Sequence, residues 1–188
     1  MSHSHVIDYV VLSKIPNDLN GTMILDVAMG KGWWGFLIRT EKGGSPLLVG
    51  VDISKEYVLK QRNLKIYDML ILSDVRYLPI KQGAFDFILA CEIIEHLTKE
   101  EGMAFLKDIE DVGSKIIVTT PKGFWETRDL KGYERHISGW EIKEFKERNY
   151  EITVVSDLSK ILRLVDRIRR LFFRLPKPLK EIVAYKQT

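Results

Sequence analysis

The sequence predicts an α/β fold in which a mostly parallel, doubly wound sheet carries helices on both faces. Short apolar runs bounded by glycine, proline or aspartate alternate along the 188 residues with longer, charged, helix-like stretches. That alternation is typical of successive βαβ units. The length suits one domain with a substantial core, and we expect residues 1–188 to form a single domain.

Each element follows from a local pattern. A leading helix is predicted over residues 6–15, where Pro16 ends it. Strands are predicted in the apolar runs 22–27, 47–51, 69–73, 85–91 and 115–120, and helices in the stretches 33–40, 55–63, 97–111 and 139–149, the last with Ser138 as N-cap. Two further strands, 150–156 and 181–185, flank a basic amphipathic helix at about 158–175. The result is a seven-stranded sheet with an antiparallel terminal strand, in which these last two strands close the sheet with an antiparallel edge.

Cysteine content and hydropathy bear on the compartment. The single cysteine, Cys91, excludes an internal disulfide and a Cys-rich zinc site, which fits a reducing cytosol. No apolar run approaches the roughly 20 residues that a membrane-spanning helix needs. The N-terminus also lacks a basic segment ahead of its short apolar patch. We therefore expect a cytoplasmic protein.

A glycine loop follows the first predicted strand. The stretch ILDVAMGKGWWGF contains G-x-G-x-x-G at Gly30, Gly32 and Gly35, and Asp52 follows at a spacing compatible with a dinucleotide-binding fold. Asp26, however, lies four residues before Gly30, where its charge would repel a pyrophosphate and attract a cation. A cationic cofactor without phosphate suits this loop better than a dinucleotide.

The loop ILDVAMGKG resembles motif I of the class I S-adenosylmethionine-dependent methyltransferases, in which an acidic strand end precedes G-x-G-x-G. The similarity continues in order to about residue 150. It implies a Rossmann-like domain, S-adenosylmethionine as cofactor and a transferase activity of the EC 2.1.1 type. Ala28 stands where the family usually has glycine, and alanine should fit there if its φ is negative.

The resemblance assigns the cofactor contacts. Asp52, in VGVDIS, matches the acid that holds both ribose hydroxyls, a contact suited to a carboxylate because it only accepts hydrogen bonds. Asp74, in SDVRYLPI, matches the acid that receives the adenine amino group, with Val75 beside the ring. The expected cofactor-binding residues are Asp26, Ala28, Gly30, Gly32, Asp52, Ile53, Asp74, Val75 and Cys91, of which Cys91 is a small packing residue and no nucleophile.

Carboxylates and a histidine follow the fourth predicted strand. In CEIIEHL, Glu92, Glu95 and His96 stand at i, i+3 and i+4, so on a helical turn they would share one face at the carboxyl edge of the sheet. Two oxygens and an imidazole can hold Mg²⁺ or Mn²⁺. The stretch resembles ubiquinone-pathway O-methyltransferases and small-RNA 3′-terminal 2′-O-methyltransferases, both metal users. In the latter a further histidine precedes a tryptophan, as His136 precedes Trp140 here.

Two interpretations of this cluster stay open. The resemblance implies a metal held by Glu92, Glu95, His96 and His136. E-H-L at this place also occurs in methyltransferases without a metal, and His96 or His136 is then the best general base, since its pKa is naturally near neutrality. The expected catalytic residues are His96, His136 and Glu92.

The basic stretch at about 158–175 bears on the methyl acceptor. Its helix either packs its apolar stripe on the domain, lies on an anionic membrane surface, or attracts RNA. No RNA-binding module is recognisable, so we expect O-methylation of a small, lipid- or sugar-type acceptor. A metal-dependent RNA 2′-O-methyltransferase and a non-catalytic S-adenosylmethionine-binding partner protein remain the alternatives.

Overall fold

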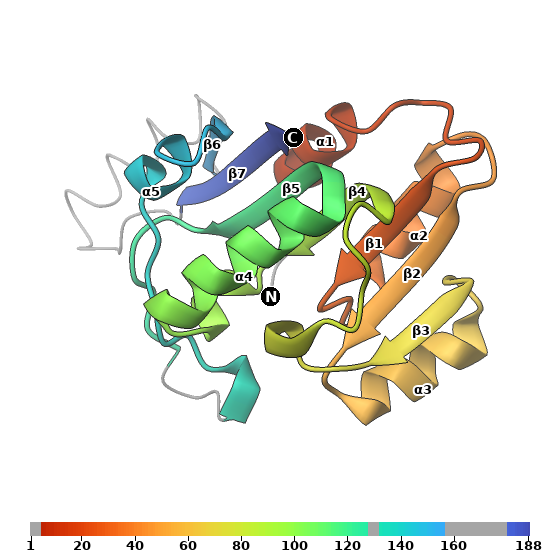
Figure 1. Ribbon diagram of the computed structural model, residues 1–188, viewed down its shortest axis with the longest axis horizontal. Coiled ribbons are helices and arrows are strands. Elements are labelled where there is room, and N and C mark those ends of the chain that lie inside the picture. The colour runs from red at the N-terminus through yellow and green to blue at the C-terminus, as the bar shows by residue number, and fades with distance from the viewer. Residues whose placement is uncertain (1–4, 128–131, 157–179) are drawn as a thin grey trace, which may run out of the picture.

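The computed structural model contains a seven-stranded sheet with the order β3-β2-β1-β4-β5-β7-β6 (Figure 1). It describes residues 5–127, 132–156 and 180–188. The strands are β1 Met23–Val27, β2 Leu47–Asp52, β3 Met69–Leu72, β4 Phe85–Cys91, β5 Gly113–Pro121, β6 Glu151–Ser156 and β7 Lys180–Gln187. Only the pairs that involve β7 are antiparallel. The predicted fold class is confirmed.

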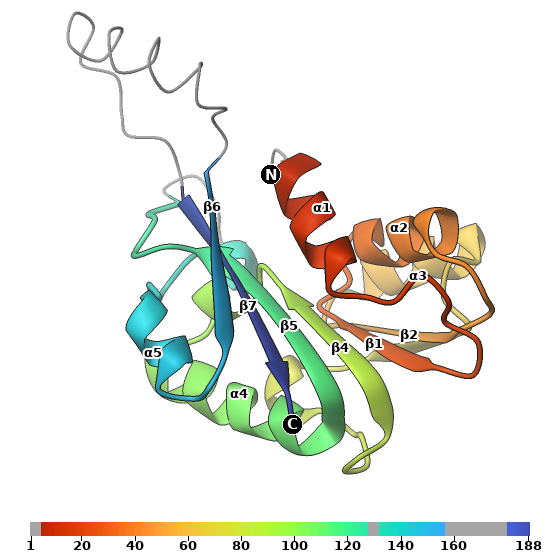
Figure 2. The ribbon, with the colours of Figure 1, turned by 90° about the horizontal axis from the view of Figure 1, so that it is seen from above.

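Helices cover both faces of the sheet (Figure 2). On one face lie α1 His5–Ser13, α2 Trp33–Glu41 and α3 Lys55–Leu64, and on the other α4 Lys99–Val112 and α5 Ile142–Lys146. Three 3₁₀ turns complete the fold, η1 Val75–Tyr77, η2 Ile94–His96 and η3 Gly132–Glu134. In the ranges described, no helix is both long and apolar enough to cross a bilayer.

The two terminal strands close the sheet with an antiparallel pair, as predicted. β7 is inserted between β5 and β6, so β6 forms the edge. The cause is visible in the burial, because Ile182, Val183 and Ala184 of β7 are all buried, whereas β6 is largely half-exposed. A strand that is apolar on both faces needs neighbours on both sides and a covered sheet. The basic helix predicted at 158–175 falls outside the described residues.

The last predicted helix is shorter than expected. Residues 139–149 were predicted as helical with Ser138 as N-cap, but α5 covers only Ile142–Lys146 and its N-cap is Glu141. Trp140 is fully buried and pairs with the backbone of residues 122 and 123. Its indole N–H donates to the Ile94 carbonyl at 3.1 Å and to Ser138 Oγ at 3.0 Å. This burial of Trp140 holds the preceding backbone extended, so the helix starts later.

Helix α4 packs on the same tryptophan. Thr98 and Glu101 form a capping box that fixes where α4 begins. One turn in, a Cβ on Gly102 would lie 2.4 Å from Cζ2 of Trp140. The glycine is therefore required by packing, although glycine weakens a helix interior.

Gly102→Ala should consequently destabilise the protein. In an unconstrained helix the change gains up to about 1 kcal/mol, but here we expect a loss of about 1–3 kcal/mol in the free energy of unfolding through overpacking. Urea unfolding measures it, with Met103→Ala at the exposed neighbouring position as control. Gly102→Ala should cost less when it is introduced into a Trp140→Phe protein than into the wild type. A Gly102→Ala protein that is more stable than wild type would contradict this packing.

Candidate functional site

A cavity of about 1100 Å³ opens at the carboxyl ends of the parallel strands. It is lined from the loops that follow β1, β2, β3, β4 and β5, and by Ile7 of α1. This is the edge at which open α/β sheets bind ligands. The volume is sufficient for a nucleoside-sized cofactor together with a second small molecule.

The glycine loop forms one wall of the cavity. The amide of Gly30 donates to Asp52 Oδ2 at 2.8 Å, and that of Met29 donates to the Val51 carbonyl at 3.0 Å. Ala28, Gly30 and Gly32 all have positive φ, of 56°, 49° and 76°. The expectation of a negative φ at Ala28 is therefore wrong. A non-glycine residue is uncommon in this region, and here the strands and Asp52 hold the turn in place.

Asp52 is fixed by the loop and faces the cavity. Its Oδ1 accepts the Ser54 amide at 2.7 Å, while Oδ2 accepts that of Gly30. Burial raises the pKa of this carboxyl, and the backbone donors oppose that rise. The neighbouring Ile53 also lines the cavity and is 43% exposed. A preorganised acceptor of this kind suits the ribose hydroxyls that the sequence assigns to it.

Asp26 does not line the cavity, contrary to the expectation that its charge faces the ligand. It is 2% exposed, and the Tyr67 hydroxyl donates to its Oδ2. The Tyr67 ring reaches Asp26 across two glycines. A Cβ on Gly35 would lie 2.5 Å from Tyr67 Cζ, and one on Gly50 would lie 2.3 Å from Met29 Sδ and 3.0 Å from Tyr67 Cδ1. Asp26 thus supports the loop from beneath.

The walls of the cavity are predominantly acidic. Among the described lining residues, six are acidic and two are Lys or Arg: Asp52, Asp74, Glu92, Glu101, Glu134 and Glu181 against Lys31 and Arg76. An anionic cavity disfavours a diphosphate and attracts cations. These carboxylates therefore fit a cofactor that carries a sulfonium and an ammonium group. The sequence predicted a negative charge that repels a pyrophosphate at this site. These cavity-lining residues supply that charge, and Asp26 does not.

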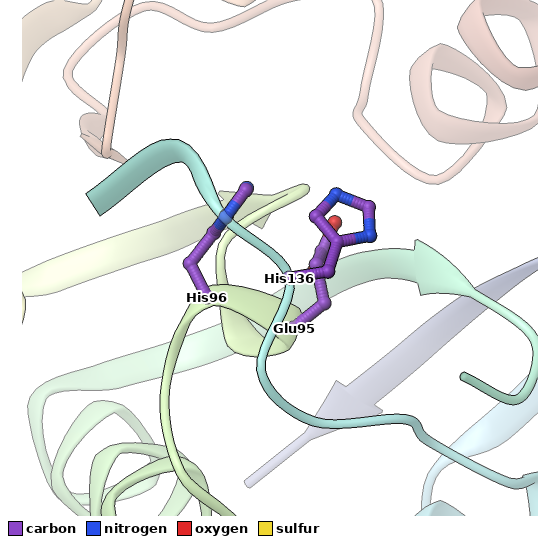
Figure 3. A group of neighbouring side chains, drawn as sticks. All are labelled: Glu95, His96 and His136. Atoms are coloured by element: carbon purple, nitrogen blue, oxygen red, sulfur yellow. The ribbon is translucent and has the colours of Figure 1, made fainter. Parts of the chain in front are cut away.

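Three side chains meet in a cluster (Figure 3), and two of them, His96 and His136, line the cavity. Glu95 and His96 come from η2 and His136 from the segment after η3, and one ligand atom from each lies within 4.8 Å of the others. Glu95 Oε2 accepts the Thr120 hydroxyl at 3.0 Å. Glu95 Oε1 and His136 Nδ1 are buried without a hydrogen-bond partner among the described residues. Two buried polar atoms without a partner in one cluster indicate a ligand.

Glu92 does not share the face of this turn. It directly follows β4 with a φ of 54°, and its carboxylate accepts the Thr119 hydroxyl at 2.8 Å. The i, i+3 pattern fails because η2 begins only at Ile94, as a single 3₁₀ turn. Burial raises the pKa of Glu92. Burial also raises the pKa of Glu95, and the nearby charge of Glu92 adds to that rise. Burial lowers the pKa of His96 and His136, so both imidazoles are held neutral.

Comparison with known proteins identifies the domain. Residues 24–114 match the family model of a methyltransferase domain. This stretch, from β1 to the start of β5, is similar to a methyltransferase domain over just under half of the chain. No curated protein matches the sequence significantly.

Solved structures share the fold of this methyltransferase domain. A Haloferax volcanii methyltransferase in complex with the Trm112 activator has a TM-score of 0.68 and 16% identity, over 94% of this chain and 88% of that one. An Aquifex aeolicus SAM-dependent methyltransferase gives 0.59 and 17% over 94% and 88%. A Haemonchus contortus phosphoethanolamine N-methyltransferase in complex with S-adenosylhomocysteine gives 0.66 and 14% over 98% and 53%.

Beyond Asp52 lies the position that the family uses for adenine. Val75 is buried and lines the cavity next to Asp74. Arg76 pairs with the Asp74 carboxylate and also with Glu101, at 2.8 Å. The Arg76 hydrogen bonds lower the pKa of Asp74. The predicted contact with the adenine amino group therefore involves a carboxylate that Arg76 already orients, a partner that the sequence did not reveal.

Aromatic residues of the methyltransferase domain were also missed. Trp33, Trp125 and Tyr133 line the cavity, and the Trp33 indole N–H donates to Asp8 Oδ1 of α1 at 2.9 Å. Their contacts join segments far apart in the chain, so no local pattern reveals them. Cys91 lines the cavity too, but burial raises the pKa of its thiol well above the ordinary value, which fits a packing role.

Asp26→Asn should change the pH dependence of stability. Burial raises the pKa of Asp26 from 3.8 to about 7, so the folded chain holds this proton more tightly than the unfolded chain. The wild-type free energy of unfolding then falls as pH rises from about 4 to about 7. Relative to wild type, Asp26→Asn should gain about 1 kcal/mol per pH unit across that window.

Urea unfolding at several pH values measures this difference. Asp108→Asn, an exposed position on α4, is the matched control and should follow the wild-type profile. If the Asp26→Asn profile also ran parallel to that of the wild type, Asp26 would not be the buried titrating group.

Proposed function

We propose that this chain is an S-adenosylmethionine-dependent methyltransferase that acts on an oxygen of a small, lipid- or sugar-type acceptor. The observation that carries the proposal is the shared cavity. Gly30 and Asp52 line it, and so do His96 and His136. A cofactor on the glycine loop and an acceptor at the histidines would therefore meet in one enclosed space.

The chain's own groups account for cofactor binding. S-adenosylmethionine, when bound, supplies an electrophilic methyl group on a sulfonium. Asp52 offers its carboxylate to the ribose. The left-handed backbone conformation of Ala28 and Gly30 lets the loop turn close to the ligand. The acidic wall stabilises the positive charge of the ligand.

At the acceptor end, the imidazoles supply the proton acceptor. The ring centroids of His96 and His136 lie 4.8 Å apart, and the two ring planes are nearly perpendicular, with an angle of 80° between them. His96 Nδ1 lies 3.2 Å from the Arg135 carbonyl, which orients the ring and leaves Nε2 for an acceptor hydroxyl. Methyl transfer needs mainly alignment and a deprotonated acceptor. The walls formed by Trp125 and Tyr133 suit an acceptor with an apolar face.

We further propose that the cluster binds a divalent cation. Glu95, His96 and His136 would hold it, with Glu92 nearby on Thr119. The support is the pair of buried, partnerless atoms, Glu95 Oε1 and His136 Nδ1. One carboxylate and two imidazoles suit Mn²⁺ better than Mg²⁺, which prefers oxygen ligands. With such a cation bound, the imidazoles would act as its ligands in place of a base, and the cation itself would favour deprotonation by lowering the pKa of the acceptor hydroxyl.

Two other functions need separate tests. A metal-dependent RNA 2′-O-methyltransferase would bind RNA with an affinity that falls steeply with salt. A non-catalytic partner protein would bind the cofactor and transfer no methyl group to any acceptor. The complete acid and histidine cluster favours catalysis over this last function, because a pure binding protein has no use for it.

Asp52→Asn should weaken the binding of S-adenosylhomocysteine. One carboxylate oxygen is lost, while the Gly30 and Ser54 amides still need an acceptor. A hydrogen bond to a charged group is worth about 1.5–3 kcal/mol, so calorimetry should show a loss of about tenfold or more. Asp108→Asn removes the same charge from the surface and should leave the affinity unchanged. Unaltered binding by Asp52→Asn would contradict the assigned role.

Metal binding is tested by titrating Mn²⁺ into chelator-treated protein. A His3→Ala/His5→Ala background removes the two N-terminal imidazoles and should bind one Mn²⁺. Adding His136→Ala or Glu95→Gln to it should weaken that binding by at least about tenfold. If the background protein binds no Mn²⁺ and transfers methyl groups in EDTA, the cluster acts without a metal.

A further inference from the structure

A buried glutamine lies behind the glycine loop. Gln61 is the one buried residue of α3 and is 0% exposed, although glutamine is mostly a surface residue. Its Nε2 donates to the Gly30 carbonyl at 3.4 Å. Its Oε1 is buried and has no hydrogen-bond partner among the described residues. A buried polar atom without a partner costs stability, so this side chain needs an explanation other than packing.

The glycine loop is shaped around this amide. Gly32 has a φ of 76°, and a Cβ on it would lie 2.7 Å from Gln61 Cδ. Gly30 is held from two sides, because its amide donates to Asp52 Oδ2 at 2.8 Å and its carbonyl accepts from Gln61. The side chain of Gln61 therefore sets the orientation of the peptide group that joins Gly30 to Lys31.

That orientation presents a backbone donor to the cavity. The C=O and N–H of a trans peptide point in opposite directions, and no described peptide bond is cis. Gln61 does not line the cavity, whereas Gly30 and Lys31 do. With the Gly30 carbonyl turned back to Gln61, the Lys31 amide points into the cavity. Within the described ranges no acceptor takes a hydrogen bond from this amide.

The Lys31 side chain adds a positive charge at the same place. Of the two cationic residues among the described lining residues, Arg76 is paired with Asp74 and Glu101. Lys31 is exposed and forms no ion pair with any described residue. Lys31 also lies two residues before α2, whose amino end is the positive end of the helix dipole. The donor and the charge together suit a carboxylate, which the acidic walls elsewhere in the cavity would repel.

We propose that Gln61 is a positioning residue that turns the Gly30–Lys31 peptide toward the cavity, so that the amide and the ammonium group of Lys31 bind the carboxylate of the cofactor's amino acid part. The inference rests on the proposed function, because S-adenosylmethionine carries that carboxylate. It also explains why Gln61 keeps an unpartnered amide oxygen, since an apolar side chain of the same size would leave the peptide unoriented.

Calorimetric titration with two ligands tests the proposal. One is S-adenosylhomocysteine, and the other is its decarboxylated analogue, which keeps the adenosine, the sulfur and the amine. The wild type should bind S-adenosylhomocysteine about tenfold more tightly than the analogue, because only the former offers a charged acceptor to Lys31. Lys31→Met and Gln61→Met should each weaken S-adenosylhomocysteine binding by about threefold or more. Both variants should bind the analogue as the wild type does.

Matched controls separate positioning from general effects. Lys60→Met removes the same charge from an exposed position of α3, and Gln82→Met removes an exposed amide. Both controls should bind the two ligands as the wild type does. Urea unfolding of each variant shows that it is folded. A purely structural role of Gln61 would weaken the binding of both ligands equally, because the loop would then be loosened as a whole.

Several results would overturn the proposal. These are equal affinity of the wild type for the two ligands, equal loss for both ligands in Gln61→Met, or unaltered S-adenosylhomocysteine binding by either variant. In each of these cases S-adenosylhomocysteine still binds, and the proposed function stands. A wild-type protein that binds neither ligand would refute the proposed function together with this inference.

Discussion

The hydrogen bond from Tyr67 to Asp26 is the contact on which the site depends. Its partners are 41 residues apart, and it joins the end of β1 to the chain entering β3 beneath the glycine loop. Both Gly35 and Gly50 leave room for the Tyr67 ring. The third glycine of G-x-G-x-x-G is thus present for packing, and not for a pyrophosphate. Tyr67 holds Asp26, and on the cavity side of the loop Asp52 accepts a hydrogen bond from the Gly30 amide.

The sheet was predictable because its strands are covered on both faces. Parallel strands of this kind are near-continuous apolar runs, as in β1 and β4, and such runs need no distant information to be recognised. The position of β7 was not predictable, since it depends on which neighbour covers each face. The length of α5 likewise depends on Trp140, which contacts η2 and the end of β5.

The candidate site likewise contains residues whose position was predictable from the sequence and residues whose orientation was not. Asp52, Val75, His96 and His136 lie where the motifs placed them, because each follows directly from a strand end or a short turn. Asp26 carries the right chemistry but points away from the cavity, where Tyr67 binds its carboxylate, and Glu92 lines the cavity with its carboxylate held by Thr119. A sequence motif fixes which side chain is available. The partners that orient it come from other strands, and the motif does not contain them.

Taken together, the cavity combines an anionic wall, a preorganised acceptor for a ribose and a base cluster. This combination distinguishes it from the site of a dinucleotide-dependent enzyme with the same glycine pattern, in which a phosphate group sits at the helix N-terminus. The most direct test is calorimetric titration of the wild-type protein with S-adenosylhomocysteine and, separately, with NADH. We predict one-to-one binding of S-adenosylhomocysteine and no binding of NADH. Binding of NADH alone would contradict the assignment of the cavity.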